Sequence, residues 1–211
     1  MNYELRIMNY IKVCGMRDAE NIREVERLGI DMMGFICWPK SPRYVREVPA
    51  YLPDCPRVGV FVNPSLDYVL ERTKAFGFNF IQLHGTESPE FCKAVREKTG
   101  CKVIKAISFN SEADLELANQ YECTADIFIF DTKCATIGGS GQKFNWDILS
   151  SYRGELPFLL SGGIGPEDAE QLRQFHHEKC LGFDINSRFE VEPGIKDIEK
   201  IKQFITALRK S

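Results

Sequence analysis

The sequence predicts an α/β protein built as a single (β/α)8 barrel of the TIM-barrel class. Short apolar runs alternate with segments of helical periodicity along the chain. The apolar runs are continuous rather than alternating, which is typical of parallel strands covered on both faces. Eight such units in 211 residues average about 26 residues each, near the lower end for a barrel. A doubly wound open sheet is the alternative, because periodicity does not prove closure.

The predicted units follow one another along the chain. Residues 1–10 show no periodicity and are interpreted as a lead-in. Asp18 stands where the N-cap of the first helix is expected, and Gly29 ends that helix. Each strand is expected to precede a helix, and Pro166 is expected to open the helix after the seventh strand. The expected strands cover 11–16, 32–37, 57–62, 79–83, 101–107, 126–130, 157–161 and 181–185, and expected helices include 88–98, 111–119, 145–151 and 195–209.

Composition limits the classes of function. With 44% hydrophobic and 27% charged residues, the chain can form one core, so a single domain over 1–211 is expected. The net charge of −3 disfavours nucleic acid and anionic membranes as partners. No apolar run approaches the roughly 20 residues that span a bilayer, and the N-terminus does not resemble a secretory signal. A cytoplasmic protein is expected.

The eight cysteines do not predict a disulfide framework or a metal site. None of them forms a Cys-x-x-Cys pair, and three histidines are too few for a ready zinc set. Seven thiols are therefore expected to be reduced and mostly buried. The eighth, Cys14, ends the first strand and is a candidate for chemistry.

Candidate site residues follow the strands, because the carboxyl ends of all barrel strands meet at one face. Glycine-rich turns after the seventh and eighth strands can direct backbone N–H groups at an anion, and this part of a barrel is a frequent phosphate site. A phosphate monoester is thus the expected kind of substrate. The candidates are Cys14, Arg43, Asn63, His84, Lys105, Asp131, Gly162, Gly163, Asp184, Asn186 and Ser187.

Cys14 and Asp131 are the expected acid/base pair. Cys14 is close in sequence to Arg17, a cation that could hold it as a thiolate, whereas a buried structural thiol is the alternative. Asp131 follows four apolar residues, so poor solvation is expected to raise its pKa and make it a general acid. Capping of the following loop is the alternative for Asp131.

Two basic residues have competing interpretations. Arg43 lies in a loop stiffened by prolines, which suits bidentate binding of a carboxylate, although a surface arginine is the alternative. Lys105 raises the hypothesis of an aldolase with a Schiff-base lysine. A lysine paired with a neighbouring carboxylate is the preferred interpretation.

Several motifs occur in order over nearly the whole chain. They include Lys-Val-Cys-Gly-Met-Arg at 12–17, Ser-Pro-Arg-Tyr-Val at 41–45, Gln-Leu-His-Gly at 82–85, Phe-Asp-Thr at 130–132, Gly-Gly-Ser-Gly at 138–141 and Leu-Ser-Gly-Gly-Ile at 160–164. Together they resemble the motifs of the phosphoribosylanthranilate isomerase family. The resemblance implies a cofactor-free Amadori rearrangement of N-(5-phosphoribosyl)anthranilate to 1-(2-carboxyphenylamino)-1-deoxyribulose 5-phosphate, in tryptophan biosynthesis.

The resemblance also implies roles for individual residues. Asp131 would protonate the furanose ring oxygen, and Cys14 would remove the C2′ proton of the resulting Schiff base. Arg43 would bind the anthranilate carboxylate, Asp184 would lie near the bridging nitrogen, and His84 would also bind substrate. The phosphate would contact Gly162, Gly163, Asn186 and Ser187.

One motif departs from the family pattern. The family usually reads Ser-Gly-Val-Glu after the eighth strand, whereas this chain has Arg188 at the second position. If that position requires a positive φ, arginine costs about 1–2 kcal/mol, so weaker or rearranged phosphate binding is expected.

A binding protein that has lost catalysis is the non-enzyme alternative. The related isomerase of histidine biosynthesis is disfavoured. The resemblance to that family would imply an acid/base pair of two aspartates, whereas the first strand of this chain ends in Cys14. Either a monomer or a homodimer is compatible with the sequence.

Overall fold

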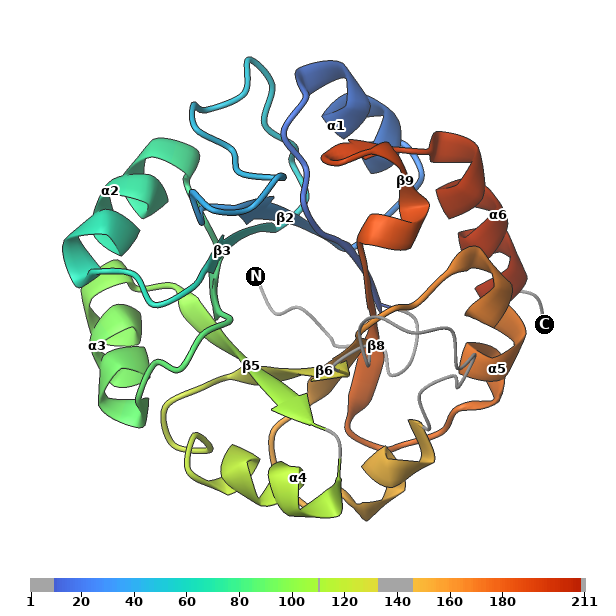
Figure 1. Ribbon diagram of the computed structural model, residues 1–211. Coiled ribbons are helices and arrows are strands. Elements are labelled where there is room, and N and C mark those ends of the chain that lie inside the picture. The colour runs from blue at the N-terminus through green and yellow to red at the C-terminus, as the bar shows by residue number, and fades with distance from the viewer. Residues whose placement is uncertain (1–9, 110, 133–145, 210–211) are drawn as a thin grey trace.

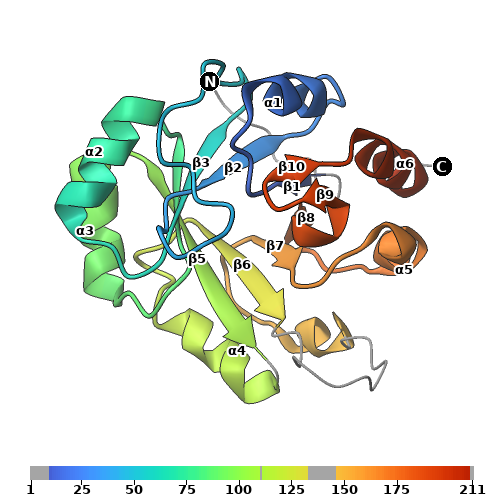
Figure 2. The same ribbon diagram turned by 45° about the horizontal axis from the view of Figure 1, so that its top comes forward.

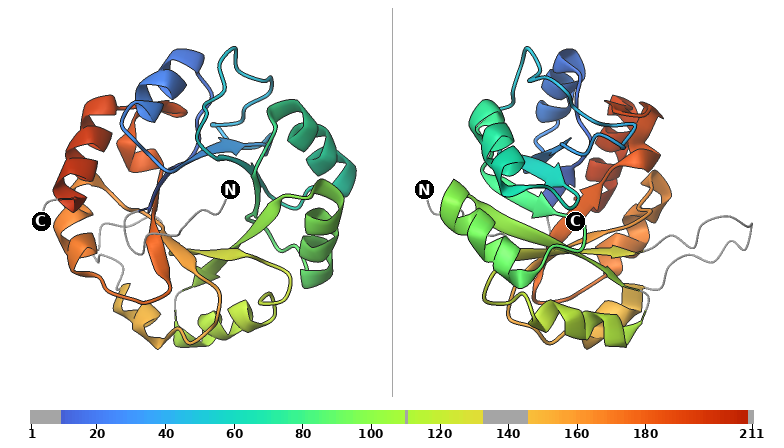
Figure 3. Two further views of the ribbon diagram at one scale, coloured as in Figure 1. Left: turned by 180° about the vertical axis from the view of Figure 1, so that it is seen from behind. Right: turned by 60° about the vertical axis from the view of Figure 1, so that its left-hand side comes forward.

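Eight parallel strands close into a barrel in the computed structural model, which describes residues 10–109, 111–132 and 146–209. The strands follow one another around the ring in chain order, and β8 pairs with β1 to close it (Figures 1 and 3). The closed barrel is therefore confirmed over the open sheet. The strands are β1 (Tyr10–Val13), β2 (Met32–Ile36), β3 (Arg57–Phe61), β4 (Phe80–Leu83), β5 (Lys102–Phe109), β6 (Ile127–Thr132), β7 (Phe158–Ser161) and β8 (Cys180–Ile185).

Helices surround the barrel (Figure 1). Asp18 caps the first of them, its side chain accepting from the Asn21 N–H at 2.9 Å, which confirms the expected N-cap. No helix within the described residues is long and apolar enough to cross a membrane. The helices are α1 (Ala19–Glu26), α2 (Leu66–Phe76), α3 (Pro89–Thr99), α4 (Glu112–Asn119), α5 (Ala169–Gln174) and α6 (Ile198–Leu208), with 3-10 turns η1 (Trp146–Ser151), η2 (Pro166–Asp168) and η3 (Ser187–Phe189).

Two expectations about helices are wrong. Residues 37–56, all described, form a loop without a helix between β2 and β3 (Figure 2). Prolines at 39, 42, 49, 53 and 56 remove backbone donors there. The segment expected as a helix from 195 instead begins with β10 (Ile195–Lys196), which pairs with β9 (Glu190–Glu192) as a hairpin. Of the predicted helix 145–151, Trp146–Ser151 form the 3-10 helix η1, and residue 145 lies outside the described residues. The strand β1 begins at Tyr10, within the expected lead-in.

The barrel has two apolar layers, one inside the ring and one between the strands and the helices. Alternate residues of a strand point to opposite faces. On β1, Ile11 and Val13 belong to the outer layer, whereas Cys14 belongs to the cluster inside the barrel. Both faces are buried, which explains the continuous apolar runs. Of the described cysteines, most are buried, whereas Cys55 is partly exposed and Cys123 is exposed.

An irregularity in β8 sets the direction of its side chains. Phe158 pairs with Cys180, but the next residue of β7, Leu159, pairs with Gly182, so β8 has one extra residue. Leu181 packs inside the barrel, and Asp184, three positions later, also faces the interior pocket. Gly182 has φ 154°, and a Cβ there would lie 2.0 Å from the Tyr10 carbonyl oxygen. Only glycine fits at this point.

Candidate active site

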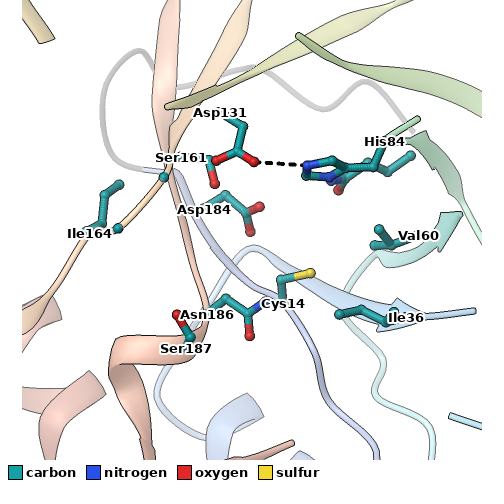
Figure 4. A pocket seen from close by; sticks show the side chains of 13 residues that line it. Cys14, Ile36, Val60, His84, Asp131, Ser161, Ile164, Asp184, Asn186 and Ser187 are labelled. Atoms are coloured by element: carbon teal, nitrogen blue, oxygen red, sulfur yellow. Dashed lines mark hydrogen bonds and ion pairs between the residues drawn. The ribbon is translucent and has the colours of Figure 1, made fainter. Parts of the chain in front are cut away.

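A pocket opens at the carboxyl ends of the strands, where barrel proteins carry their active sites (Figure 4). It brings together eight of the residues predicted from the sequence, which lie on or directly after β1, β4, β6, β7 and β8. Arg43, Asn63 and Lys105 are not part of its lining. The lining consists of Cys14, Ile36, Val60, Gln82, His84, Asp131, Ser161, Gly162, Gly163, Ile164, Asp184, Asn186 and Ser187.

Cys14 follows β1 directly and is only 4% exposed. Burial raises the pKa of its thiol, while the nearby ammonium groups of Lys12 and Lys196 act in the opposite direction. Arg17, the cation expected beside Cys14, is instead exposed and donates to the Pro42 carbonyl at 3.4 Å. The cation that most strongly lowers the pKa of the Cys14 thiol is Lys12, which the sequence analysis missed.

Asp131 lies near the end of β6 and pairs with His84. The His84 Nε2 is 3.0 Å from Asp131 Oδ2, and the Gln82 side-chain nitrogen donates to His84 Nδ1 at 2.9 Å. In the tautomer with the ring proton on Nε2, Nδ1 accepts from the Gln82 amide and Nε2–H donates to Asp131. The Asp131 side chain is 28% exposed, so it is partly shielded from solvent at the pocket. Figure 4 shows the Asp184 carboxylate between this pair and Cys14.

Arg43 lies outside the pocket lining and is bound to Glu190. Its Nε and Nη2 contact both carboxylate oxygens, the shortest contact being 2.6 Å. Lys196 donates to Glu190 at 2.7 Å and to the Asn186 side-chain oxygen at 2.7 Å. Arg43 is thus connected through Glu190 and Lys196 to Asn186, which does line the pocket.

Glu190→Gln is expected to weaken the fold in a pH-dependent way. Burial raises the pKa of Glu190, but hydrogen bonds from Arg43 and Lys196 outweigh this and hold the pKa below its ordinary 4.5. A depressed carboxyl pKa stabilises the fold above that ordinary value, and this stabilisation is lost as the pH falls through the folded-state pKa. Breaking this nearly buried pair should cost about 3 kcal/mol at pH 7.

Urea denaturation of both proteins at pH 7, 5 and 4 measures this effect. The gap in unfolding free energy between wild type and Glu190→Gln should shrink below pH 4.5. Glu170→Gln, which removes an exposed contact to Arg173 of 2.8 Å, is the control and should change little at any pH. A constant gap for Glu190→Gln would contradict the assigned ion pair.

The glycine turn after β7 has the backbone that the sequence pattern requires. Gly162 and Gly163 have φ of 91° and 66°, which disfavours residues with a Cβ. Arg188 does not need such a conformation, since Asn63 is the one non-glycine residue with positive φ among those described. The expected backbone penalty at Arg188 is therefore absent. Its side chain is 51% exposed, and its guanidinium pairs with Glu167 outside the pocket lining.

Lys105 is buried and satisfied by other partners. Its ammonium donates to Glu87 at 3.0 Å and to the Gly85 carbonyl at 2.7 Å. Glu87 also accepts from the Asn63 backbone N–H at 2.8 Å, so the cluster fastens the loop that follows His84. Lys105 is thus paired with a neighbouring carboxylate, which is the interpretation preferred from the sequence. Because Lys105 does not line the pocket, the aldolase hypothesis has no lysine there to form a Schiff base.

Several members of the site were missed from the sequence. Lys12 and Gln82 each precede a predicted site residue by two positions, so strand alternation places them on the same face, and this signal could have identified them. Glu190 becomes relevant only through its partner Arg43. The motif at 138–141 lies outside the described residues. Among those described, no group of three or more His, Cys, Asp or Glu side chains is arranged to hold a metal ion.

The fold and the pocket define a (β/α)8-barrel protein with thiol, carboxyl and imidazole groups converging at the catalytic face of the barrel. The model of the N-(5′-phosphoribosyl)anthranilate isomerase family matches residues 11–207. The chain belongs to this family.

Individual relatives agree with the family match. An isomerase of this name from Phocaeicola vulgatus is 50% identical over 200 residues, covering 94% of this chain and 97% of the relative. The one from Parabacteroides distasonis is 46% identical over 202 residues, covering 92% and 91%. The crystal structure of the Thermotoga maritima isomerase superposes with a TM-score of 0.80 at 32% identity, covering 96% of this chain and 99% of that one.

Proposed function

We propose that this protein is a phosphoribosylanthranilate isomerase of tryptophan biosynthesis, which converts N-(5-phosphoribosyl)anthranilate to 1-(2-carboxyphenylamino)-1-deoxyribulose 5-phosphate. The observation that carries the proposal is that a thiol on the first strand unit and a carboxyl on the sixth face one pocket. A related isomerase, 30% identical with a TM-score of 0.77 and covering 96% of this chain and 99% of its own, was solved with the reduced form of that product.

Asp131 is the proposed general acid of the first step. Its proton passes to the furanose ring oxygen as the C1′–O bond breaks, and the nitrogen lone pair forms the C1′=N bond of a Schiff base. His84 fixes the carboxyl group through its Nε2–H, and Gln82 fixes the imidazole ring. Because Asp131 is partly exposed at the pocket, substrate can reach it directly.

Cys14 is the proposed general base of the second step. Its thiolate removes the C2′ proton, the C–H electron pair forms the C1′=C2′ bond, and the iminium nitrogen receives the displaced electrons. The enolamine then tautomerises to the ketone. The protonated imine of the substrate is itself the electron sink, so the proposed reaction needs no cofactor.

Arg43 and Asp184 are the proposed contacts for the anthranilate part, and Gly162, Gly163, Asn186 and Ser187 for the phosphate. Glu190 occupies the Nε and Nη2 edge of the Arg43 guanidinium, so the carboxylate of the substrate would bind the Nη1 side. The glycine turn and the two polar residues all line the pocket.

The proposed activity is tested by fluorescence. Phosphoribosylanthranilate is generated in place from anthranilate and phosphoribosyl pyrophosphate with the enzyme that joins them, and its fluorescence decay is followed. Wild-type protein should accelerate the decay far above spontaneous hydrolysis. A decay rate equal to that without protein would reject the isomerase and favour a binding protein on the same scaffold.

Replacing Arg43 with lysine should raise KM by about 10-fold or more while changing kcat less, because lysine keeps the charge but loses the planar fork that binds a carboxylate. Steady-state kinetics measure both constants. Arg46→Lys, an exposed change in the same loop, is the control. Unchanged KM in Arg43→Lys would show that this residue only anchors Glu190.

The oligomeric state and location are further parts of the proposal. We propose a cytoplasmic protein that exists as a monomer or homodimer. A related structure describes monomers generated from the dimeric Thermotoga maritima isomerase, and that protein is 29% identical with a TM-score of 0.78. Light scattering coupled to gel filtration separates the two states of this chain.

A further inference from the structure

Lys12 is a buried cation inside the barrel, two residues before Cys14. Its side chain is fully shielded from solvent, and its ammonium lies 2.8 Å from Asp184 Oδ1. Its charge also lowers the pKa of the Cys14 thiol, which lies two positions later on the same face of the chain. Lys12 does not line the pocket, whereas both of its partners do. It therefore lies behind the reactive groups and can act only through them.

The other charges near Cys14 are already engaged. Lys196 of β10 and Arg43 of the loop after β2 both contact Glu190, at 2.7 and 2.6 Å. His84, which follows β4, and Asp131 of β6 act electrostatically on Asp184, which lies between them and Cys14 (Figure 4). Lys196 also lowers the pKa of the Cys14 thiol, but its ammonium is paired with Glu190. Lys12 is paired with Asp184, so Lys12, Asp184 and Cys14 form a group of one cation and two acids.

A buried group of this kind holds one negative charge more readily than two. With one ammonium, the first anion is paired, whereas a second would remain uncompensated in a region of low dielectric constant. The negative charge can reside on Asp184, with Cys14 as a thiol, or on Cys14, with Asp184 protonated. Lys12 remains charged in both states.

We propose that Lys12 is a positioning residue that allows Cys14 to become a thiolate by transferring its proton to Asp184. In this step Lys12 gives one Nζ proton to Asp184 and receives the Cys14 proton, so the S–H bond breaks, the carboxyl O–H bond forms and the ammonium is restored. No other reactant is required. The inference rests on the proposed function, because it supplies the thiolate that removes the C2′ proton.

The directions of the pKa shifts agree with this scheme. Burial raises the pKa of both Cys14 and Asp184, which makes each of them able to hold a proton. Burial lowers the pKa of Lys12, but Asp184 and Cys14 outweigh that effect and raise it above its ordinary value. The lysine is thus the member that stays charged.

The scheme predicts opposite effects of two substitutions on the thiol. Lys12→Met should raise the pH at which Cys14 is half-alkylated by iodoacetamide by about one unit or more, equivalent to about tenfold less thiolate. Asp184→Asn should lower that pH, since Lys12 then pairs with the thiolate alone. Mass spectrometry of the Cys14 peptide from the intact, folded protein measures the rates, and Lys12→Arg should resemble wild type.

A double variant protects the test against misfolding. Lys12→Met leaves Asp184 buried and unpaired, whereas Lys12→Met with Asp184→Asn removes both charges and keeps similar volume. In the double variant, the pH at which Cys14 is half-alkylated should lie about one pH unit or more above that of Asp184→Asn alone. Equal midpoints in these two proteins would overturn the proposal and leave Lys12 as a structural partner of Asp184.

Kinetics give an independent readout. Lys12→Met should reduce kcat by about 100-fold, within the range for losing a general base, and leave KM within about threefold. A fall in thermal stability with unchanged kcat would also overturn the proposal. Because alkylation needs no substrate, it tests Lys12 even if wild-type protein fails to consume phosphoribosylanthranilate, which would reject the proposed function instead.

Discussion

Replacing Cys14 with alanine is expected to reduce kcat by about 10³-fold to 10⁴-fold, because the group that removes the C2′ proton is lost. The Cys14 side chain packs closely against Gly34, since a Cβ built on Gly34 would lie only 2.9 Å from the Cys14 sulfur. Alanine at position 14 is smaller than cysteine and therefore fits there without strain. Substrate binding should persist, since the phosphate and carboxylate contacts are elsewhere. The fluorescence decay assay measures kcat, and fluorescence titration measures binding.

Cys92→Ala is the matched control for this variant. Cys92 is also a buried thiol, but it lies on α3 in the outer apolar layer and not in the pocket. It should retain wild-type kcat and lose only stability. If Cys14→Ala turned over at a rate similar to Cys92→Ala, the thiol would be a packing residue and another base would be required.

Asp131→Asn should cause a comparable loss, about 10³-fold in kcat, through the other half of the pair. Asparagine keeps the shape of the aspartate side chain. Its amide oxygen can still accept from His84 Nε2, which lies 3.0 Å from Asp131 Oδ2 in the wild-type structure. It cannot donate a carboxylic proton to the ring oxygen. Retention of substantial turnover in Asp131→Asn would place the acid elsewhere in the site.

The largest effect on folding is expected from Gly182→Ala. The new Cβ would lie 2.0 Å from the Tyr10 carbonyl oxygen and 2.6 Å from the Tyr10 nitrogen, where β1 and β8 close the barrel. Backbone cannot yield as a flexible side chain does, so the closing pair of strands must separate. We expect insoluble protein or a fall in Tm of about 10 °C or more.

Gly100→Ala separates the effect of contact from that of backbone conformation. Gly100 ends α3 with φ 69°, and a Cβ there would have no atom within 4 Å. Its cost should be about 1–2 kcal/mol, or a few degrees in Tm. Calorimetry of both variants compares them, and equal shifts would show that the contact with Tyr10 is relieved.

The sequence by itself determined the alternation of strands and helices, and from it most of the pocket. Continuous apolar runs require strands that are buried on both faces, which parallel barrels provide. Because strand ends meet at one face, Cys14 and Asp131 were placed in the same pocket although they are far apart in the chain. Local chemistry was equally readable, as the Asp18 cap shows.

Only the tertiary structure decided which charges meet. The extra residue at Gly182 turns Asp184 toward the pocket, and this brings it within 2.8 Å of Lys12. Glu190, the partner of Arg43, belongs to the hairpin of β9 and β10. The second strand of this hairpin lies where the sequence predicted the start of a helix. Such contacts join residues distant in sequence, and their register depends on bulges and packing that local propensity does not encode.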